Sequence, residues 1–148
     1  MLRFISNENN PKALCMLTLR GLCNLFKNQA SSHVAMLNAS RLIDAVLPFL
    51  THADKNVRQA AITMHLNYSV ELQLKDNPEA RTQVIAGIAT CIGQETDLQN
   101  ILRASITLGN CAHKNAEAQS LISSMGLEWP AEGTWVAAAG EAGTDATK

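Results

Sequence analysis

Three asparagines recur at a fixed interval inside apolar stretches of the chain. Asn24, Asn67 and Asn110 lie 43 residues apart, in RGLCNLF, MHLNYSV and ITLGNCAH. Asparagine is a poor residue for a helix interior because its amide competes for backbone hydrogen bonds, so each of these residues requires a partner or a special position. A polar residue that returns at this interval indicates an internal repeat, and armadillo and HEAT arrays have repeats of about 40 to 47 residues.

The composition favours helices packed through aliphatic side chains. Hydrophobic residues make up 47% of the 148 residues, but only 4% are aromatic. We therefore predict an all-α, armadillo/HEAT-like helical repeat solenoid of about three repeats. A plain helical bundle is the alternative, but a bundle provides no reason for an asparagine to return at a fixed interval.

Helix start signals divide the first half of the chain. Asn10 and Pro11 begin a helix that we expect to end near Asn28. We expect a second helix to begin at Ser31 or Ser32 and to be kinked near its end by Pro48. A break between residues 38 and 40, which would divide it into two helices, is an alternative.

In the second half, Asp54 is expected to cap a helix with the sequence KNVRQAAITMHLNYSVELQL, and Asn77 to cap the next. Thr96, followed three residues later by a glutamine, has the form of a capping box. Asn115 caps a last short helix that ends at Gly126. We therefore expect three regions: a remnant or flexible start (1–9), an armadillo-like domain (10–127) and a flexible Ala/Gly-rich tail (128–148).

Charge and cysteine usage exclude several classes of function. The net charge is −1, so no overall charge favours nucleic acid or an anionic membrane. No apolar run approaches the length of about 20 residues that spans a bilayer, and we expect an intracellular protein. The four cysteines lack the spacing of a zinc site, and no glycine-rich phosphate loop occurs, so we expect neither metal nor cofactor.

The three asparagines predict a peptide-binding groove. Amides at equivalent positions of a solenoid form a row that can hydrogen-bond the backbone of an extended peptide. Arg103 lies on the same helix face as Asn110, and Arg20 on the same face as Asn24. Since guanidinium groups bind carboxylates through a bidentate fork, we expect an acidic ligand. The alternative is that the asparagines hold neighbouring helices together and that the arginines are solvated surface charges.

A thiol enzyme is the least favoured alternative. Cys15 or Cys111 could be combined with His33, His65 or His113 as nucleophile and base. No local sequence supports such a pair, and cysteines carried on helices are normally core residues. We therefore expect no enzymatic activity.

Several separated segments resemble one known family. The segments MLTLRGLCNLFKNQ, DKNVRQAAITMHLNYSVELQLKDN and DLQNILRASITLGNCAHKNAEAQSLISSMGL are similar, in order and spacing, to the PUL domain of the phospholipase A2-activating protein family. The residues from Asn67 to Val70 and from Arg103 to Gly109 are the most distinctive matches. The resemblance covers roughly residues 10–127 and implies that they form the later part of an armadillo-like PUL domain.

The resemblance also implies a function. Such a domain is expected to be an adaptor that binds the acidic C-terminal tail of valosin-containing protein, the AAA ATPase of ubiquitin-dependent protein turnover. Ubiquitin-pathway components would be indirect partners, in the cytoplasm and with the nucleus as a second compartment. On this reading Arg20 and Arg103 bind carboxylates of the tail, and Asn24, Asn67 and Asn110 lie along it. A generic armadillo scaffold for another peptide, such as a basic nuclear-import signal, is the alternative.

Overall fold

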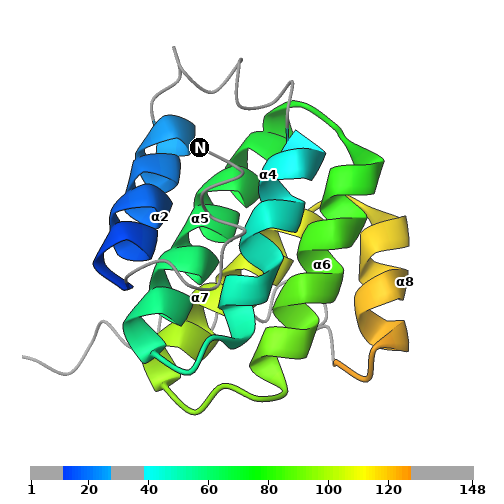
Figure 1. Cartoon of the computed structure of the whole chain (residues 1–148). Helices are drawn as coiled ribbons and strands as arrows, with labels where there is room; N and C mark the ends of the chain where they lie inside the picture. The colour runs from blue at the N-terminus through cyan, green and yellow to red at the C-terminus, as the bar shows by residue number, and fades with distance from the viewer. Residues whose placement is uncertain (1–11, 28–38, 128–148) are drawn as a thin grey trace, which may run out of the picture.

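The computed structural model describes residues 12–27 and 39–127. Every regular element in these ranges is helical, which confirms the all-α prediction (Figure 1). The elements are α2 (Lys12–Lys27), α4 (Ala39–Val46), the short 3-10 helix η1 (Leu47–Thr51), α5 (Lys55–Leu74), α6 (Pro78–Ile92), α7 (Leu98–Ala112) and α8 (Ala116–Ser124).

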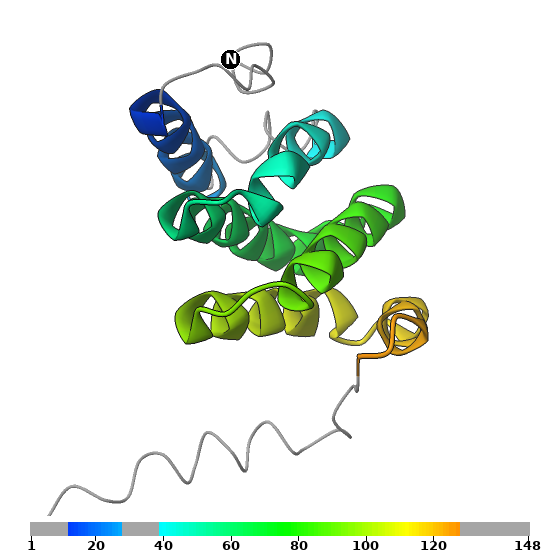
Figure 2. The ribbon, with the colours of Figure 1, turned by 60° about the horizontal axis from the view of Figure 1, so that its bottom comes forward.

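The α-helices form two rows. Helices α2, α5 and α7 pack side by side in one row, and α4, α6 and α8 form the other (Figure 2). Each layer therefore pairs one helix from each row, as α2 with α4, α5 with α6, and α7 with α8. This arrangement is the helical repeat solenoid of about three repeats that the sequence predicts.

Most helix ends follow the predicted caps. The Asp54 carboxylate accepts hydrogen bonds from the backbone amides at the start of α5, and Asn77 and Asn115 do the same for α6 and α8. Gly126, at a φ of 76°, follows the end of α8 in the left-handed conformation that glycine adopts easily.

The capping box predicted at Thr96 is wrong. Asp97 caps α7, and its carboxylate accepts from the backbone amides of Gln99 and Asn100. An ionised carboxylate is a stronger acceptor than a hydroxyl, so the helix begins one residue later than the threonine would place it.

Two of the predicted helix starts lie outside the described residues. They are the Asn10–Pro11 start of the first helix and the start of the second helix at Ser31 or Ser32, which is described only from Ala39. At Pro48, where a kink is predicted, the chain changes from α4 into η1. Helix α6 passes close to η1 at Gly87, where an added Cβ would overlap a methyl carbon of Leu47.

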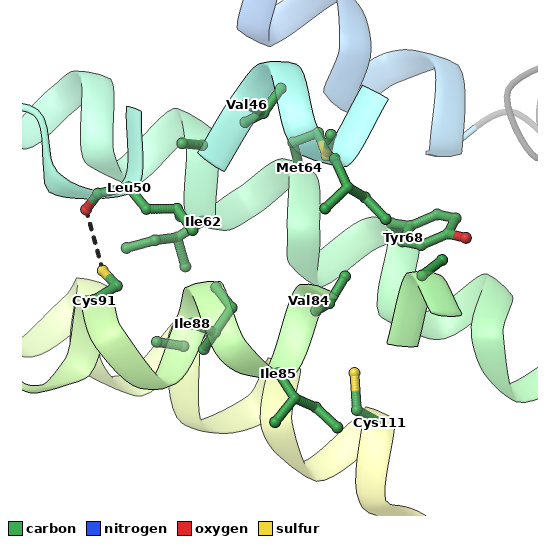
Figure 3. Packing of buried hydrophobic residues seen from close by; sticks show 14 of the residues in the cluster. Val46, Leu50, Ile62, Met64, Tyr68, Val84, Ile85, Ile88, Cys91 and Cys111 are labelled. Carbon is green, nitrogen blue, oxygen red and sulfur yellow. Dashed lines mark hydrogen bonds between the residues drawn. The ribbon is translucent and has the colours of Figure 1, made fainter. Parts of the chain in front are cut away.

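The core lies between the two rows. Aliphatic side chains of α4, η1, α5 and α6 interdigitate there, and the thiol of Cys91 donates to the Leu50 carbonyl oxygen at 3.3 Å (Figure 3). Phe26 of α2 packs on Tyr68 of α5, with ring centroids 5.0 Å apart. These contacts fix the spacing of the helices that carry the candidate site.

The 43-residue period also appears in ion pairs between layers. Lys12, at the start of α2, pairs with Asp54 before α5. Lys55, at the start of α5, pairs with Asp97 before α7 at 3.5 Å. Both lysines and both aspartates are 43 residues apart, so each carboxylate caps one helix and also binds the lysine of the preceding layer.

Candidate peptide-binding site

Two of the three repeated asparagines join neighbouring helices of the first row. The side-chain amide of Asn67 on α5 donates to the backbone carbonyl of Cys23 on α2 at 3.0 Å. Asn110 on α7 donates to the Ser69 hydroxyl at 2.9 Å and accepts from the Gln73 amide at 3.1 Å. These amides therefore satisfy polar groups across the boundary between layers, which accounts for asparagine inside an apolar helix at these two positions. Peptide contact by Asn67 or Asn110 stays a prediction.

The third asparagine, Asn24, is exposed and faces an open groove between α2 and α5. This groove, here named the α2–α5 groove, has a volume of about 600 Å³. Its lining residues come from both helices: Lys12, Met16, Arg20, Cys23, Asn24, Asn56, Gln59, Ala60 and Thr63. It thus brings together the predicted pair Arg20 and Asn24.

The other predicted pair lies elsewhere. Arg103 and Asn110 belong to α7, and α5 lies between α7 and α2 (Figure 2). Arg103 is partly exposed and donates to the carbonyl oxygen of Gln99 at 3.0 Å, within its own helix. The five predicted residues therefore all lie on one row of helices, but only two line the α2–α5 groove.

Charge in the α2–α5 groove is positive. Lys12 and Arg20 contribute cationic groups, and none of the lining residues is acidic. Lys12 is paired with Asp54, and its hydrogen bond is the largest cause of the lowered pKa of that carboxyl. Among the described residues, no carboxylate pairs with Arg20. A guanidinium without such a partner can bind a carboxylate from a ligand.

Arg58 shows what an arginine with a structural role looks like in this fold. Its guanidinium forms a fork with Glu95, in which both N to O distances are 2.8 Å, and it also donates to the carbonyl oxygens of His52 and Ala53. The Glu95 side chain is only 1% exposed. Arg58 holds the pKa of Glu95 far below its usual range. Because its guanidinium is occupied by Glu95 and by two backbone carbonyl oxygens, Arg58 has a structural role and is not part of the candidate site.

Of the groove-lining residues that the sequence did not predict, four can offer a hydrogen bond or a charge to a ligand: Lys12, Asn56, Gln59 and Thr63. The last three lie on the same face of α5 as Asn67, because successive residues of this set are three or four positions apart. Thr63 also lies 43 residues after Arg20. Combining the repeat with the helical period could have identified this face. The pairing of Lys12 with Asp54 depends on the packing of α2 against α5, which the local sequence does not specify.

Two of the residues considered for a thiol enzyme, Cys111 and His65, lie in the core. Burial raises the pKa of Cys111 to about 12, whereas a nucleophilic thiol requires a lowered pKa. His65 is fully buried, and its Nδ1 lies 2.8 Å from the Ala61 carbonyl oxygen. His113 is exposed, and His33 lies outside the described residues.

Within residues 12–27 and 39–127, no cluster of three or more potential metal-ligating side chains occurs. In the same ranges, none of the helices combines the length and the apolar character that crossing a membrane requires.

Comparison with known proteins supports one family. The chain matches the PUL domain family over residues 2–141. It is also 28% identical over 124 residues to the phospholipase A-2-activating protein of Xenopus laevis, a match that covers 84% of this chain and 16% of that relative. The chain therefore spans a small part of the length of this relative. The family match covers nearly the whole sequence, and the chain belongs to the PUL domain family.

Proposed function

We propose that this PUL domain is an adaptor whose α2–α5 groove binds an acidic, extended peptide. The observation that carries the proposal is the position of Arg20, which lines an open groove and has no carboxylate partner among the described residues. In contrast, Arg58 and Arg81 of the same fold are both paired with carboxylates. Membership of the PUL family supports a protein-interaction module.

The groove contains groups for each part of such a ligand. The Arg20 guanidinium would bind a peptide carboxylate through two parallel N–H to O hydrogen bonds. The side-chain amides of Asn24, Asn56 and Gln59 offer donors and acceptors to the peptide backbone. Met16 and Ala60 supply apolar surface for aliphatic parts of the peptide. Charge at Arg20 would select acidic residues, whereas the amides would bind any extended backbone.

Helix α7 would extend this surface along the row. Arg103 has no carboxylate partner among the described residues and lies on the helix that follows α5 in the row. A peptide that leaves the α2–α5 groove across α5 would reach Arg103 and Asn110 next. Asn110 already binds Ser69 and Gln73, so its contact with a peptide would require the exchange of one of these hydrogen bonds.

The partner that we propose is the acidic C-terminal tail of the valosin-containing AAA ATPase, which links the domain to ubiquitin-dependent turnover in the cytoplasm or nucleus. The absence of acidic residues among the groove-lining side chains argues against a basic nuclear-import signal as the ligand. The raised pKa of Cys111 argues against this thiol as a nucleophile.

Binding of a synthetic acidic tail peptide to the full 148-residue chain tests this proposal. Arg20→Ala should weaken binding by about 1 to 3 kcal/mol because a charge-assisted hydrogen bond is lost. The loss should be larger at low salt than at high salt. Arg103→Ala should weaken binding less than Arg20→Ala, because only the part of the peptide that leaves the α2–α5 groove would reach α7.

Arg41→Ala is the matched control, since Arg41 is an exposed arginine on α4 in the other row. Its removal changes the net charge equally but leaves the α2–α5 groove intact. Equal affinities of the Arg20→Ala and Arg41→Ala proteins would reject the groove as the site. Tighter binding of a basic peptide would instead favour the generic scaffold.

A further inference from the structure

Three large apolar side chains lie along one exposed face of helix α7. Leu98, Leu102 and Ile106 are each four residues apart, so they share a single face of the helix. They are 79%, 52% and 42% exposed, respectively. A single exposed leucine is common on protein surfaces, but three that adjoin one another form a continuous apolar surface, here named the α7 stripe. Such a surface indicates a site of interaction.

The ion pairs between layers show which positions of the first-row helices are equivalent. Lys12 on α2 and Lys55 on α5 each bind the aspartate that caps the next helix of the row. The row therefore keeps one register, in which residues 43 positions apart occupy equivalent places. In this register, Leu98 of α7 corresponds to the two lysines.

The α7 stripe continues the face of the row that carries the α2–α5 groove. Leu102 corresponds to Gln59 of α5. Ile106 corresponds to Thr63 of α5 and to Arg20 of α2. These three earlier residues all line the groove. Along the row, in the order of helices that Figure 2 shows, this face therefore changes from cationic on α2, through polar on α5, to apolar on α7.

We propose that the α7 stripe binds a large apolar side chain of the same acidic peptide whose carboxylate binds Arg20, so that the ligand has an acidic part and an apolar part. This inference rests on the proposed function and specifies its ligand. Packed helices lie about 8 to 10 Å apart, so α2 and α7 are about 20 Å apart across α5. An extended peptide spans about 3.3 Å per residue, which places the apolar residue about six positions from the acidic residue at Arg20.

Charge and area favour such a peptide over a second copy of the chain. Arg103 follows Leu102 on α7 and has no carboxylate partner among the described residues. A symmetric contact between two stripes would bring two Arg103 guanidinium groups into one small interface, whereas an acidic peptide supplies carboxylates to them. Three side chains also offer much less than the area of about 800 Å² per partner that a stable interface buries.

Titration of the full 148-residue chain with three labelled peptides tests this inference. One peptide is acidic and has no large apolar residue. The other two carry a single leucine about six positions before or after the acidic block. One of the leucine peptides should bind about five- to tenfold more tightly than the purely acidic peptide, because part of the leucine surface leaves water. This gain should persist at high salt, where the charge-dependent part of binding weakens.

Leu102→Ser should abolish the gain from leucine and leave the affinity for the purely acidic peptide unchanged. Leu102 is half exposed, so far-UV circular dichroism of this variant should match that of the unaltered protein. Leu74→Ser is the matched control, since Leu74 is 72% exposed at the end of α5 and outside the α7 stripe. The control protein should keep the full gain.

The outcomes separate this inference from the proposed function. If the purely acidic peptide binds and leucine adds nothing at either position, the apolar part of the ligand is rejected and the proposed function stands. A gain that Leu102→Ser leaves intact has the same meaning. Failure of the purely acidic peptide to bind would reject the proposed function and this inference with it. Dimers seen by sedimentation that Leu102→Ser dissociates would also overturn the inference, because a second copy would then occupy the α7 stripe.

Discussion

The two boundaries between neighbouring helices of the first row belong to the same repeat but are held together by different contacts. Between α5 and α7, Arg58 and Glu95 form a buried fork, and Asn100 donates to both Glu95 and the Lys55 carbonyl oxygen. Between α2 and α5, Lys12 and Asp54 form an exposed pair, and an open groove of about 600 Å³ remains.

The difference shows how one repeat can serve both stability and binding. Where a charged pair is largely buried, as Arg58 and Glu95 are, it joins layers and is not accessible to a ligand. Where a cation such as Arg20 has no described carboxylate partner and the surface is hollow, the same row of helices offers a binding site. The first boundary is therefore the candidate site, and the second gives the array its rigidity.

The largest expected effect comes from breaking the fork at the α5–α7 boundary. Glu95→Ala should lower the free energy of unfolding by about 3 to 5 kcal/mol, because Arg58 keeps a largely buried charge without its partner. Urea denaturation at pH 7 measures the change. In the unaltered protein this stabilisation is fully present above about pH 4.5 and falls as the pH drops toward the lowered pKa of Glu95. A loss of unfolding free energy below about 1 kcal/mol would contradict the larger contribution of the α5–α7 boundary to stability.

His65 occupies a core position that the other layers fill with leucine. Leu22 and Leu108 stand 43 residues on either side of it, and all three side chains are buried. Burial lowers the pKa of His65 to about 4 in the folded protein. Between about pH 6.5 and pH 4, the histidine is therefore protonated in the unfolded chain but neutral in the folded protein. The protein should lose up to about 3 kcal/mol as the pH falls from about 6.5 to about 4.

His65→Leu should remove this pH dependence and, at pH 7, stabilise the protein by about 1 to 2 kcal/mol, because Nε2 of His65 has no hydrogen-bond partner among the described residues. Thermal unfolding across this pH range provides the measurement. An unchanged slope in the variant would assign the pH dependence to other groups, such as the carboxylates.

The repeated asparagines allow the boundaries to be compared at equivalent positions. Asn67→Ala should cost about 1 kcal/mol of stability because the Cys23 carbonyl loses its donor. Asn24→Ala should leave stability within about 0.5 kcal/mol, since Asn24 is exposed, but should weaken binding of an acidic peptide. Denaturation and peptide titration of both variants would separate the two roles. Equal stability losses would contradict the division between joining and binding asparagines.

The exposed ion pairs should have the smallest effect. Lys55→Ala should cost at most about 0.5 kcal/mol, because its pair with Asp97 is solvent-exposed at 3.5 Å. Lys12→Ala should be equally mild in stability, but it should also weaken peptide binding at low salt because Lys12 lines the groove. Equal peptide affinities of the Lys12→Ala and Lys55→Ala proteins would show that Lys12 does not contribute to peptide binding.

The sequence predicts much of the fold because its signals are local or periodic. Asp54, Asn77 and Asn115 act within three residues of the helix starts that they cap, and the 43-residue interval predicts the layers. Thr96 was the wrong cap because a hydroxyl and a carboxylate stand side by side there, and the stronger acceptor caps the helix.

The candidate site was only partly predictable. Arg20 and Asn24 share a helix face, so their proximity follows from the sequence. The fork between Arg58 and Glu95 joins residues 37 positions apart on different layers, and it depends on how loops meet when layers stack. The groove likewise exists only because α2 and α5 leave space between their exposed faces.

Backbone amide chemical shifts recorded while an acidic tail peptide is added to the full chain test the central claim most directly. The account predicts that the largest changes occur on the walls of the α2–α5 groove, at Arg20, Asn24, Gln59 and Thr63. Smaller changes should follow toward Arg103. Changes confined to α6 and α8, or no changes at saturating peptide, would contradict it.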